Sequence, residues 1–124
     1  MSLEPSVILF YVDSMEQSSR FYENLLGIKP EKASITYHIF KLSNGMNLAL
    51  KANYAVEIAT DKKSAYGELA FTVDSKNKVD ELFAKWRASE ISIILPPTNL
   101  PYGYAFAAID PNGNRLRVVS LRKS

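Results

Sequence analysis

The chain has 124 residues and a formal net charge of +2, and 47% of its residues are hydrophobic and 23% charged. These values are typical of one globular domain, and the small charge gives no indication of a nucleic-acid partner or of an anionic membrane surface. The sequence contains no cysteine, which excludes disulfides, thiolate metal sites and cysteine nucleophiles. Neither a signal peptide nor an apolar run long enough to span a bilayer is visible, so we expect a cytoplasmic protein.

The chain begins with a predicted strand followed by a helix. The run "SVILFYV" (Ser6–Val12) is rich in β-branched and aromatic residues, which favours a strand. Asp13 or Ser14 can cap the helix that follows. Its apolar stripe ends before Gly27, which is typical of a helix C-terminus.

A hairpin and a linker are predicted next. Ile35–Leu42 and Met46–Lys51 read as two strands joined by the turn Ser43–Gly45. Residues 52–66 are mixed and polar, and read as a linker with at most one helical turn.

The second half predicts the same order of elements. The turn "DPNG" (Asp110–Gly113) has the composition of a tight turn, in which the Asp side chain bonds the backbone. The predicted elements are the strand Glu68–Ser75, the helix Lys76–Glu90, the strand Ile91–Pro97 ended by its two prolines, and the strands Tyr102–Asp110 and Asn114–Leu121.

The two halves form an internal repeat. A shift of 61 positions aligns Asp13 with Asp74, and a shift of 68 aligns Asn44-Gly45 with Asn112-Gly113. The repeat predicts an α+β fold of two tandem βαβββ modules, with curved mixed sheets and with helices on the outer face. The predicted single domain consists of module one (about 6–52), a linker (53–66) and module two (about 67–121).

Alternation along the strands separates two sheet faces. Phe10 and Phe71 belong to the sets expected to face the helices. The other set is chemically mixed, and two interpretations remain: it lines a concave ligand cleft between the modules, or it is a sheet face in water. This set comprises Val7, Leu9, Tyr11, Asn47, Ala49, Lys51, Glu68, Ala70, Thr72, Arg115, Arg117 and Val119.

The tandem βαβββ repeat, "FYVDSMEQSSRFYENLLGIKP" and "AIDPNGNRLRVV" resemble the vicinal oxygen chelate superfamily, over about Val7 to Leu121. This superfamily includes glyoxalases, extradiol dioxygenases and bleomycin resistance proteins. "GELAFTVDS", "VDELFAKW" and "PPTNLPYGYAFAAIDPNGNRLRVVSL" resemble its phenazine-resistance branch more particularly. The resemblance implies a metal-free binding protein for a flat aromatic antibiotic, usually a homodimer.

Metal-dependent members of the superfamily hold a divalent ion with four side chains. The matching positions here are Val7, Ala49, Glu68 and Arg117, and only Glu68 could coordinate a cation. We therefore expect no metal, no cofactor and no catalytic residue. If the strands converge as in the family, Glu68 and Arg117 form an ion pair where the metal would sit; the alternative is two independent solvated charges.

Aromatic and charged residues of the second set and of nearby turns are the candidates for ligand binding. Tyr104 and Phe106 share a face and follow "PPTNLP", a loop that could lean over the cleft, although ordinary sheet packing explains them equally well. The phenazine-binding relatives often carry Trp where Lys51 stands, so Lys51 indicates an anionic or smaller ligand. His38, the only histidine, is expected to be structural or exposed. The candidate ligand-binding residues are Tyr11, Tyr37, Ala49, Lys51, Tyr54, Glu68, Tyr102, Tyr104, Phe106, Arg115 and Arg117.

The predicted function is metal-independent binding and sequestration of a small, partly aromatic molecule, with an antibiotic as the natural candidate. One alternative is a glyoxalase- or lyase-like enzyme that uses a metal, or Glu68 with Tyr11 as an acid–base pair. Another is a homologue that binds nothing, because its own side chains fill the cleft.

Overall fold

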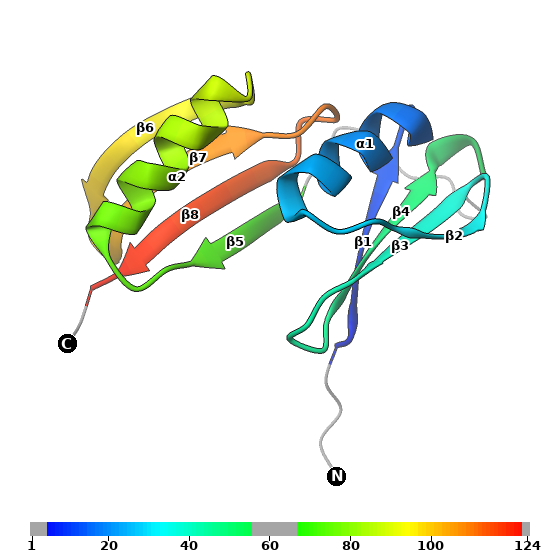
Figure 1. The fold of residues 1–124 in the computed structure, drawn as a ribbon, viewed down its shortest axis with the longest axis horizontal. Coiled ribbons are helices and arrows are strands. Elements are labelled where there is room, and N and C mark those ends of the chain that lie inside the picture. The colour runs from blue at the N-terminus through cyan, green and yellow to red at the C-terminus, as the bar shows by residue number, and fades with distance from the viewer. Residues whose placement is uncertain (1–4, 56–66, 123–124) are drawn as a thin grey trace, which may run out of the picture. The chain divides into compact units, whose positions relative to one another are not determined.

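Eight strands and two α-helices make up the computed structural model, which describes residues 5–55 and 67–122 (Figure 1). They fall into two units, and each has the order strand, helix and three strands. The first unit contains β1 (Val7–Val12), α1 (Met15–Leu26), β2 (Glu31–Ser34), β3 (Tyr37–Lys41), β4 (Asn47–Ala52) and the 3₁₀ turn η1 (Asn53–Ala55). The second contains β5 (Glu68–Thr72), α2 (Lys76–Ala88), β6 (Ser92–Leu100), β7 (Gly103–Ile109) and β8 (Arg115–Leu121).

In the first unit, α1 lies on one face of a four-stranded sheet of order β1-β4-β3-β2. The hydroxyl of Ser14 accepts a hydrogen bond from the Gln17 amide at 3.2 Å, and Gly27 ends the helix with φ of 72°. Ser14 therefore takes the capping role for which the sequence offered two candidates. Tyr22 is fully buried, and its ring lies between those of Phe10 and Phe40, both at 6.4 Å.

In the second unit, α2 lies on one face of a sheet of order β5-β8-β7-β6 (Figure 1). Ser75 caps the helix by accepting from the Lys78 amide at 3.1 Å. Trp86 makes edge-to-face contacts with Phe71 at 6.0 Å and with Phe106 at 5.1 Å. These rings form the core of the unit, since aromatic pairs in this geometry add to the free energy of burial.

The strand registers of the two sheets confirm the repeat. β1 runs parallel to β4 with Val7 opposite Asn47, and β5 runs parallel to β8 with Glu68 opposite Arg115. These two register pairs are related by the same shifts of 61 and 68 positions that align the sequence halves. The two α+β modules therefore share one topology, as the repeat predicts.

Two strand predictions were wrong. β2 was missed because all four of its side chains are exposed, so no alternation marks it, and its pairing with β3 is irregular between Lys32 and Ser34. β6 does not end at Pro96 and Pro97 but continues to Leu100. β6 is an edge strand, and its pairing with β7 shifts register between Leu95 and Thr98. Prolines can be accommodated there because these positions do not need a backbone N–H group to donate a hydrogen bond to β7. The segment predicted as the loop "PPTNLP" is therefore mostly strand.

Only the first residues of the predicted linker belong to the part of the chain that the structure describes. Its first residues form η1, which matches the expected single helical turn. Residues 56–66 lie outside the described residues. Among the residues that are described, no helix is both long and apolar enough to cross a membrane.

His38 has a structural role, as expected. The residue is 7% exposed, and its Nδ1 lies 2.8 Å from the hydroxyl of Ser19 on α1. Burial, and secondarily the nearby charge of Lys32, lower the pKa of His38 below its ordinary value of 6.5. The folded chain therefore binds a proton at this site less readily than the unfolded chain.

This lowered pKa predicts a loss of stability on acidification. The free energy of unfolding should be constant well above pH 6.5 and should fall as the pH drops from the ordinary value toward the folded-state pKa. Each unit of lowering corresponds to about 1.4 kcal/mol. Denaturant unfolding of the wild type and of His38→Gln at pH 5 and pH 7.5 should show a larger pH effect in the wild type. Equal pH effects in the two proteins would contradict the assignment.

Candidate functional site

Each sheet has a face opposite the helix of its own unit, and most predicted site residues lie on these two faces. Phe10 and Phe40 contact Tyr22 of α1, so the residues of opposite parity point away from that helix. We call these residues the α1-distal face: Val7, Leu9, Tyr11, Tyr37, Ile39, Lys41, Asn47, Ala49 and Lys51. The corresponding α2-distal face consists of Glu68, Ala70, Thr72, Ala105, Ala107, Ile109, Arg115, Arg117 and Val119.

Three predicted site residues form a row across the α1-distal face. Lys51 on β4 is the register partner of both Tyr11 on β1 and Tyr37 on β3. All three side chains are half-buried. Register partners on neighbouring strands place their Cβ atoms about 4.5–5.5 Å apart, so the three side chains leave the sheet next to one another on the same face. No sequence pattern predicted this row, because predicting it requires the register of three strands.

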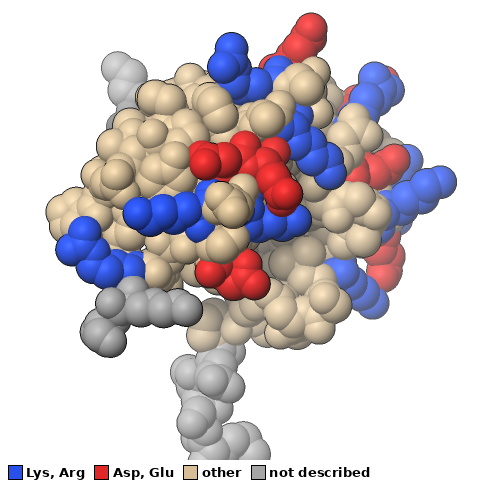
Figure 2. All heavy atoms as spheres, turned by 60° about the vertical axis from the view of Figure 1, so that its left-hand side comes forward, with Lys and Arg blue, Asp and Glu red and all other residues tan. Residues whose placement is uncertain are grey.

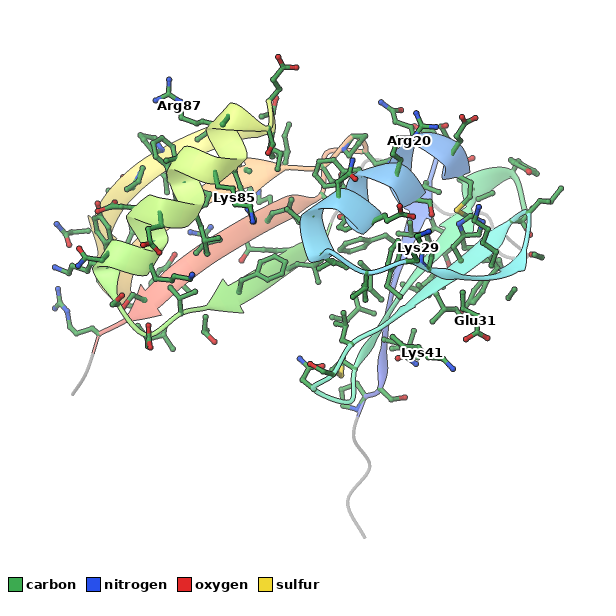
Figure 3. The ribbon with its side chains drawn as sticks, in the orientation of Figure 1. Arg20, Lys29, Glu31, Lys41, Lys85 and Arg87 are labelled. Atoms are coloured by element: carbon green, nitrogen blue, oxygen red, sulfur yellow. The ribbon has the colours of Figure 1, made fainter. Side chains whose placement is uncertain are left out.

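The next rows of the α1-distal face are apolar and then polar. Leu9, Ala49 and Ile39 form the row beside Lys51, and Ala49 is fully buried. Ile39 was not among the predicted ligand-binding residues, although its alternation with Tyr37 along the strand places it on this face. In the last row, Lys41 forms an ion pair with Glu31 of β2, with 3.0 Å between Nζ and Oε2 (Figure 3).

On the α2-distal face, Arg117 and Glu68 form the predicted ion pair. Arg117 Nε and Nη2 donate to the two carboxylate oxygens of Glu68 at 3.2 and 3.3 Å, and Nη1 donates to the hydroxyl of Tyr102 at 2.7 Å. The side chains are 18% exposed for Arg117 and 37% for Glu68. The hydrogen bonds to Glu68 raise the pKa of Arg117, so its charge is permanent. The alternative of two independent solvated charges is thereby rejected.

Tyr102 owes its position to the chain reversal between β6 and β7. Leu100 pairs with Gly103, which leaves Pro101 and Tyr102 as a two-residue turn. The Arg122 amide donates to the Tyr102 carbonyl at 2.8 Å and ties this turn to the end of β8. The phenol is thus held against Arg117, whose guanidinium carbon lies 5.9 Å from the ring centroid.

The arrangement around Arg117 can donate hydrogen bonds to a ligand. A guanidinium has five N–H groups, and the described residues accept from three of them in Arg117. Tyr102 accepts from Arg117, which leaves its own proton available for donation. Arg117 has small register neighbours, Ala70 and Ala107, on either side. A carbonyl, ring nitrogen or oxyanion is the kind of group these donors would bind.

The residues at the four family metal positions do not fit a divalent ion. Val7 and Ala49 have no donor atom, and both oxygens of Glu68 already accept from Arg117. Arg117 itself carries a positive charge that would repel a cation. In the described parts of the chain, no three His, Cys, Asp or Glu side chains come together as a possible metal site.

Two predicted ligand residues, Tyr104 and Phe106, are on the wrong face for the site. They do share a face, but that face is covered by α2. Phe106 is fully buried against Phe83 and Trp86, and the Tyr104 hydroxyl donates to Asp80 of α2 at 2.8 Å. The reason is the register across the Asp-Pro-Asn-Gly turn, which pairs Phe106 with the helix-facing Val118.

Two further candidates lie apart from these groups. Arg115 is on the α2-distal face and is exposed at the start of β8, as the register partner of Glu68. Tyr54 belongs to η1 and to neither sheet, and 74% of it is exposed. Neither position argues for or against contact with a ligand.

Charges on the surface shown in Figure 2 are mixed. Lys and Arg side chains stand beside Asp and Glu over much of that face, without one large region of a single sign. This distribution is typical of a solvated surface.

The sequence and the fold both match known proteins. Residues 5–118 match the model of a protein family described as "Glyoxalase/Bleomycin resistance protein/Dioxygenase superfamily". The chain is 25% identical to the phenazine antibiotic resistance protein EhpR of Enterobacter agglomerans, over 97% of this chain and 94% of that protein.

Solved structures show the same fold. A solution NMR structure of a protein from Agrobacterium tumefaciens is 37% identical, with 98% of this chain and 100% of that chain covered and a TM-score of 0.83. A glyoxalase/bleomycin resistance protein/dioxygenase from Nocardioides has a TM-score of 0.85 at 18% identity, with 100% and 87% covered. Because the match spans nearly the whole chain, this protein belongs to the glyoxalase/bleomycin resistance protein/dioxygenase superfamily.

Proposed function

We propose that this protein binds and sequesters a small, partly aromatic molecule, such as an antibiotic, without using a metal ion. The observation that carries the proposal is the Arg117–Glu68 ion pair. Of the residues at the four family metal positions, only Glu68 could bind a cation, and both of its carboxylate oxygens accept hydrogen bonds from Arg117. Sequestration requires only an apolar surface with a few polar anchors. Both helix-distal faces offer such a combination.

The likeness to a phenazine antibiotic resistance protein supports a resistance-type role. Its 25% identity is compatible with a different ligand. The family also contains enzymes, so the proposal has to be tested against metal-dependent catalysis.

A thermal-shift panel of planar aromatic antibiotics tests the binding role. A ligand at a hundred times its Kd should stabilise the folded protein by about 2.7 kcal/mol, which raises the Tm by several degrees. Elemental analysis of the purified protein is the companion measurement. Stoichiometric Zn²⁺, Ni²⁺ or Mn²⁺ would reject the metal-free proposal, and a panel without any stabilising compound would reject sequestration of such antibiotics.

Arg117→Met should weaken the binding of a compound found in this panel by about tenfold or more, because it removes the donors and leaves the Glu68 charge uncompensated. The free energy of unfolding should change by no more than about 1 kcal/mol, since the pair is partly exposed. Titration calorimetry and denaturant unfolding measure the two quantities. Arg20→Met, which breaks the exposed Arg20–Glu16 pair on α1, is the matched control and should bind normally. An Arg117→Met protein with wild-type affinity would place the ligand elsewhere.

We further propose that the protein acts in the cytoplasm and as a homodimer, the assembly that the resemblance of its sequence to the phenazine-resistance branch implies. Light scattering coupled to size exclusion should then give twice the mass of 13.9 kDa. A monomer at micromolar concentration would contradict the assembly.

A further inference from the structure

We propose that Asn44 is a site of spontaneous deamidation, and that the fold protects Asn112, the second asparagine that precedes a glycine, from the same reaction. The repeat makes the two positions equivalent, because a shift of 68 aligns Asn44-Gly45 with Asn112-Gly113. Each pair lies in the turn before the last strand of its module, β4 or β8. This inference is independent of the proposed function.

An asparagine followed by glycine can deamidate through its own backbone. The nitrogen of the next peptide loses its proton to a solvent base and attacks the side-chain carbon Cγ, so that a C–N bond forms and Nδ2 leaves as ammonia. One water molecule then opens the cyclic imide at either of its carbonyls and yields aspartate or isoaspartate, without oxidation or reduction. Glycine favours the attack because it has no Cβ to hinder the approach of its nitrogen.

The β3–β4 turn (Figure 1) meets the conditions for this attack, since Ser43, Asn44 and Gly45 are all exposed. A Cβ added to Gly45 would meet no atom within 4 Å other than those of its chain neighbours, so water reaches the peptide. Asn44 Oδ1 accepts from the Met46 amide at 3.0 Å, which folds the side chain over the Gly45 peptide. The hydrogen bond from the Gly45 amide to the Leu42 carbonyl is long, at 3.3 Å, and therefore weak.

The β7–β8 turn has the same pattern of backbone hydrogen bonds but contains a carboxylate. The Gly113 amide donates to the Asp110 carbonyl at 3.0 Å, and Asp110 Oδ1 accepts from the amides of Asn112 and Asn114, both at 2.8 Å. Asp110 is buried, and Asn112 and Gly113 are half-buried. These bonds hold the turn, and the charge of Asp110 disfavours a second negative charge on the Gly113 nitrogen. In the first module, Leu42 stands at the equivalent position.

Deamidation of Asn44 should change the charge of the protein without unfolding it. The product carries one additional negative charge, which lowers the formal net charge by one from its value of +2. Between the turn and the nearest buried pair of the hairpin, Phe40 and Leu48, lies the register pair of Lys41 and Asn47. A longer isoaspartyl backbone at residue 44 therefore distorts the exposed turn and leaves the core in place.

Peptide mapping of the full chain by mass spectrometry tests the difference between the two turns. During incubation of the folded protein at pH 7.5, Asn44 should convert at least about tenfold faster than Asn112. In denaturant the two rates should become similar, because both asparagines then have only the following glycine in common. Asn44→Gln should abolish conversion at this turn, since the longer side chain cyclises far more slowly, and should leave Asn112 unaffected.

Exchanging the carboxylate between the turns tests the cause of the protection. Leu42→Asp places a carboxylate at the position equivalent to Asp110 and should slow the conversion of Asn44 several-fold. Asp110→Asn removes the charge and should accelerate the conversion of Asn112 several-fold. Gln17→Glu adds the same charge to an exposed position of α1, and should leave both rates unchanged.

The rates decide whether the proposal stands. Equal rates in the folded protein, faster conversion of Asn112, or no conversion of Asn44 would overturn it. A difference that persists in denaturant would also do so, because its cause would then be the local sequence and not the fold. If Asp110→Asn does not fold, Leu42→Asp decides the role of the carboxylate, and conversion of Asn44 at the wild-type rate in that variant would reject it.

Discussion

Replacing Phe106 by alanine should lower the free energy of unfolding by about 3–5 kcal/mol, the usual cost of removing a buried aromatic ring. Phe106 is fully buried, and its ring meets those of Phe83 at 5.5 Å and Trp86 at 5.1 Å in edge-to-face geometry. The substitution removes both contacts and leaves a cavity between α2 and the sheet. A domain of this size has about 5–15 kcal/mol of stability, so the variant should be marginally folded at most.

Denaturant unfolding of the wild type, Phe106→Leu and Phe106→Ala measures this effect. Phe106→Leu fills part of the cavity and should lose less stability than the alanine variant. Tyr54→Ala is the exposed aromatic control and should change the free energy of unfolding by less than about 0.5 kcal/mol.

The same series tests the reassignment of Phe106 from the ligand site to the core. Because Phe106 faces α2, folded Phe106→Leu should bind the compounds of the antibiotic panel with wild-type affinity. Loss of binding without loss of stability would restore Phe106 as a ligand residue.

Replacing Asp110 by alanine should cost about 2–4 kcal/mol, since several hydrogen bonds to one charged acceptor are lost together. Asp110 is 4% exposed. Its Oδ1 accepts from the Asn112 and Asn114 amides, both at 2.8 Å, and its Oδ2 accepts from Asn114 Nδ2 at 3.0 Å. Asn114 Oδ1 in turn accepts from the Gly67 amide at 3.1 Å. The side chain therefore organises both the β7–β8 turn and the start of β5.

The equivalent turn of the first module supplies the control for Asp110→Ala. There the exposed Asn44 side chain accepts one hydrogen bond, from the Met46 amide at 3.0 Å. Asn44→Ala should therefore cost less than about 1 kcal/mol. Asp110→Asn keeps an acceptor but loses the charge, and should be intermediate. Equal losses in Asp110→Ala and Asn44→Ala would show that the buried network adds nothing.

Much of the fold could be predicted because its signals are local. Alternation identified β1, β5 and β8, the capping candidates and Gly27 marked the ends of α1, and the repeat predicted a common topology. β2 escaped prediction because an exposed edge strand needs no apolar alternation. The path of β6 through Pro96 and Pro97 escaped as well, because an edge position tolerates residues that break a central strand.

The candidate site was predictable only where it depended on residue type. The absence of donor atoms at Val7 and Ala49 and the permanent charge of Arg117 follow from their chemistry alone. The ion pair with Glu68 was predicted from the family resemblance, and its atoms now lie within 3.3 Å. The assignment of Tyr104 and Phe106 to the ligand site failed. Alternation showed that the two side chains share a face of the sheet, but it did not show that this face is the one covered by α2.

The sequence by itself therefore determined the two modules and their order of elements, since these depend on periodicity and on the chemistry of single residues. Only the tertiary structure decided which side chains meet. The register across the Asp110–Asn114 connection turned Phe106 toward α2 and Arg117 away from it. The parallel pairing of β1 with β4 placed Tyr11 beside Lys51. Such pairings join residues far apart in the chain, and a register shift of one residue would reverse the face of every side chain in the strand.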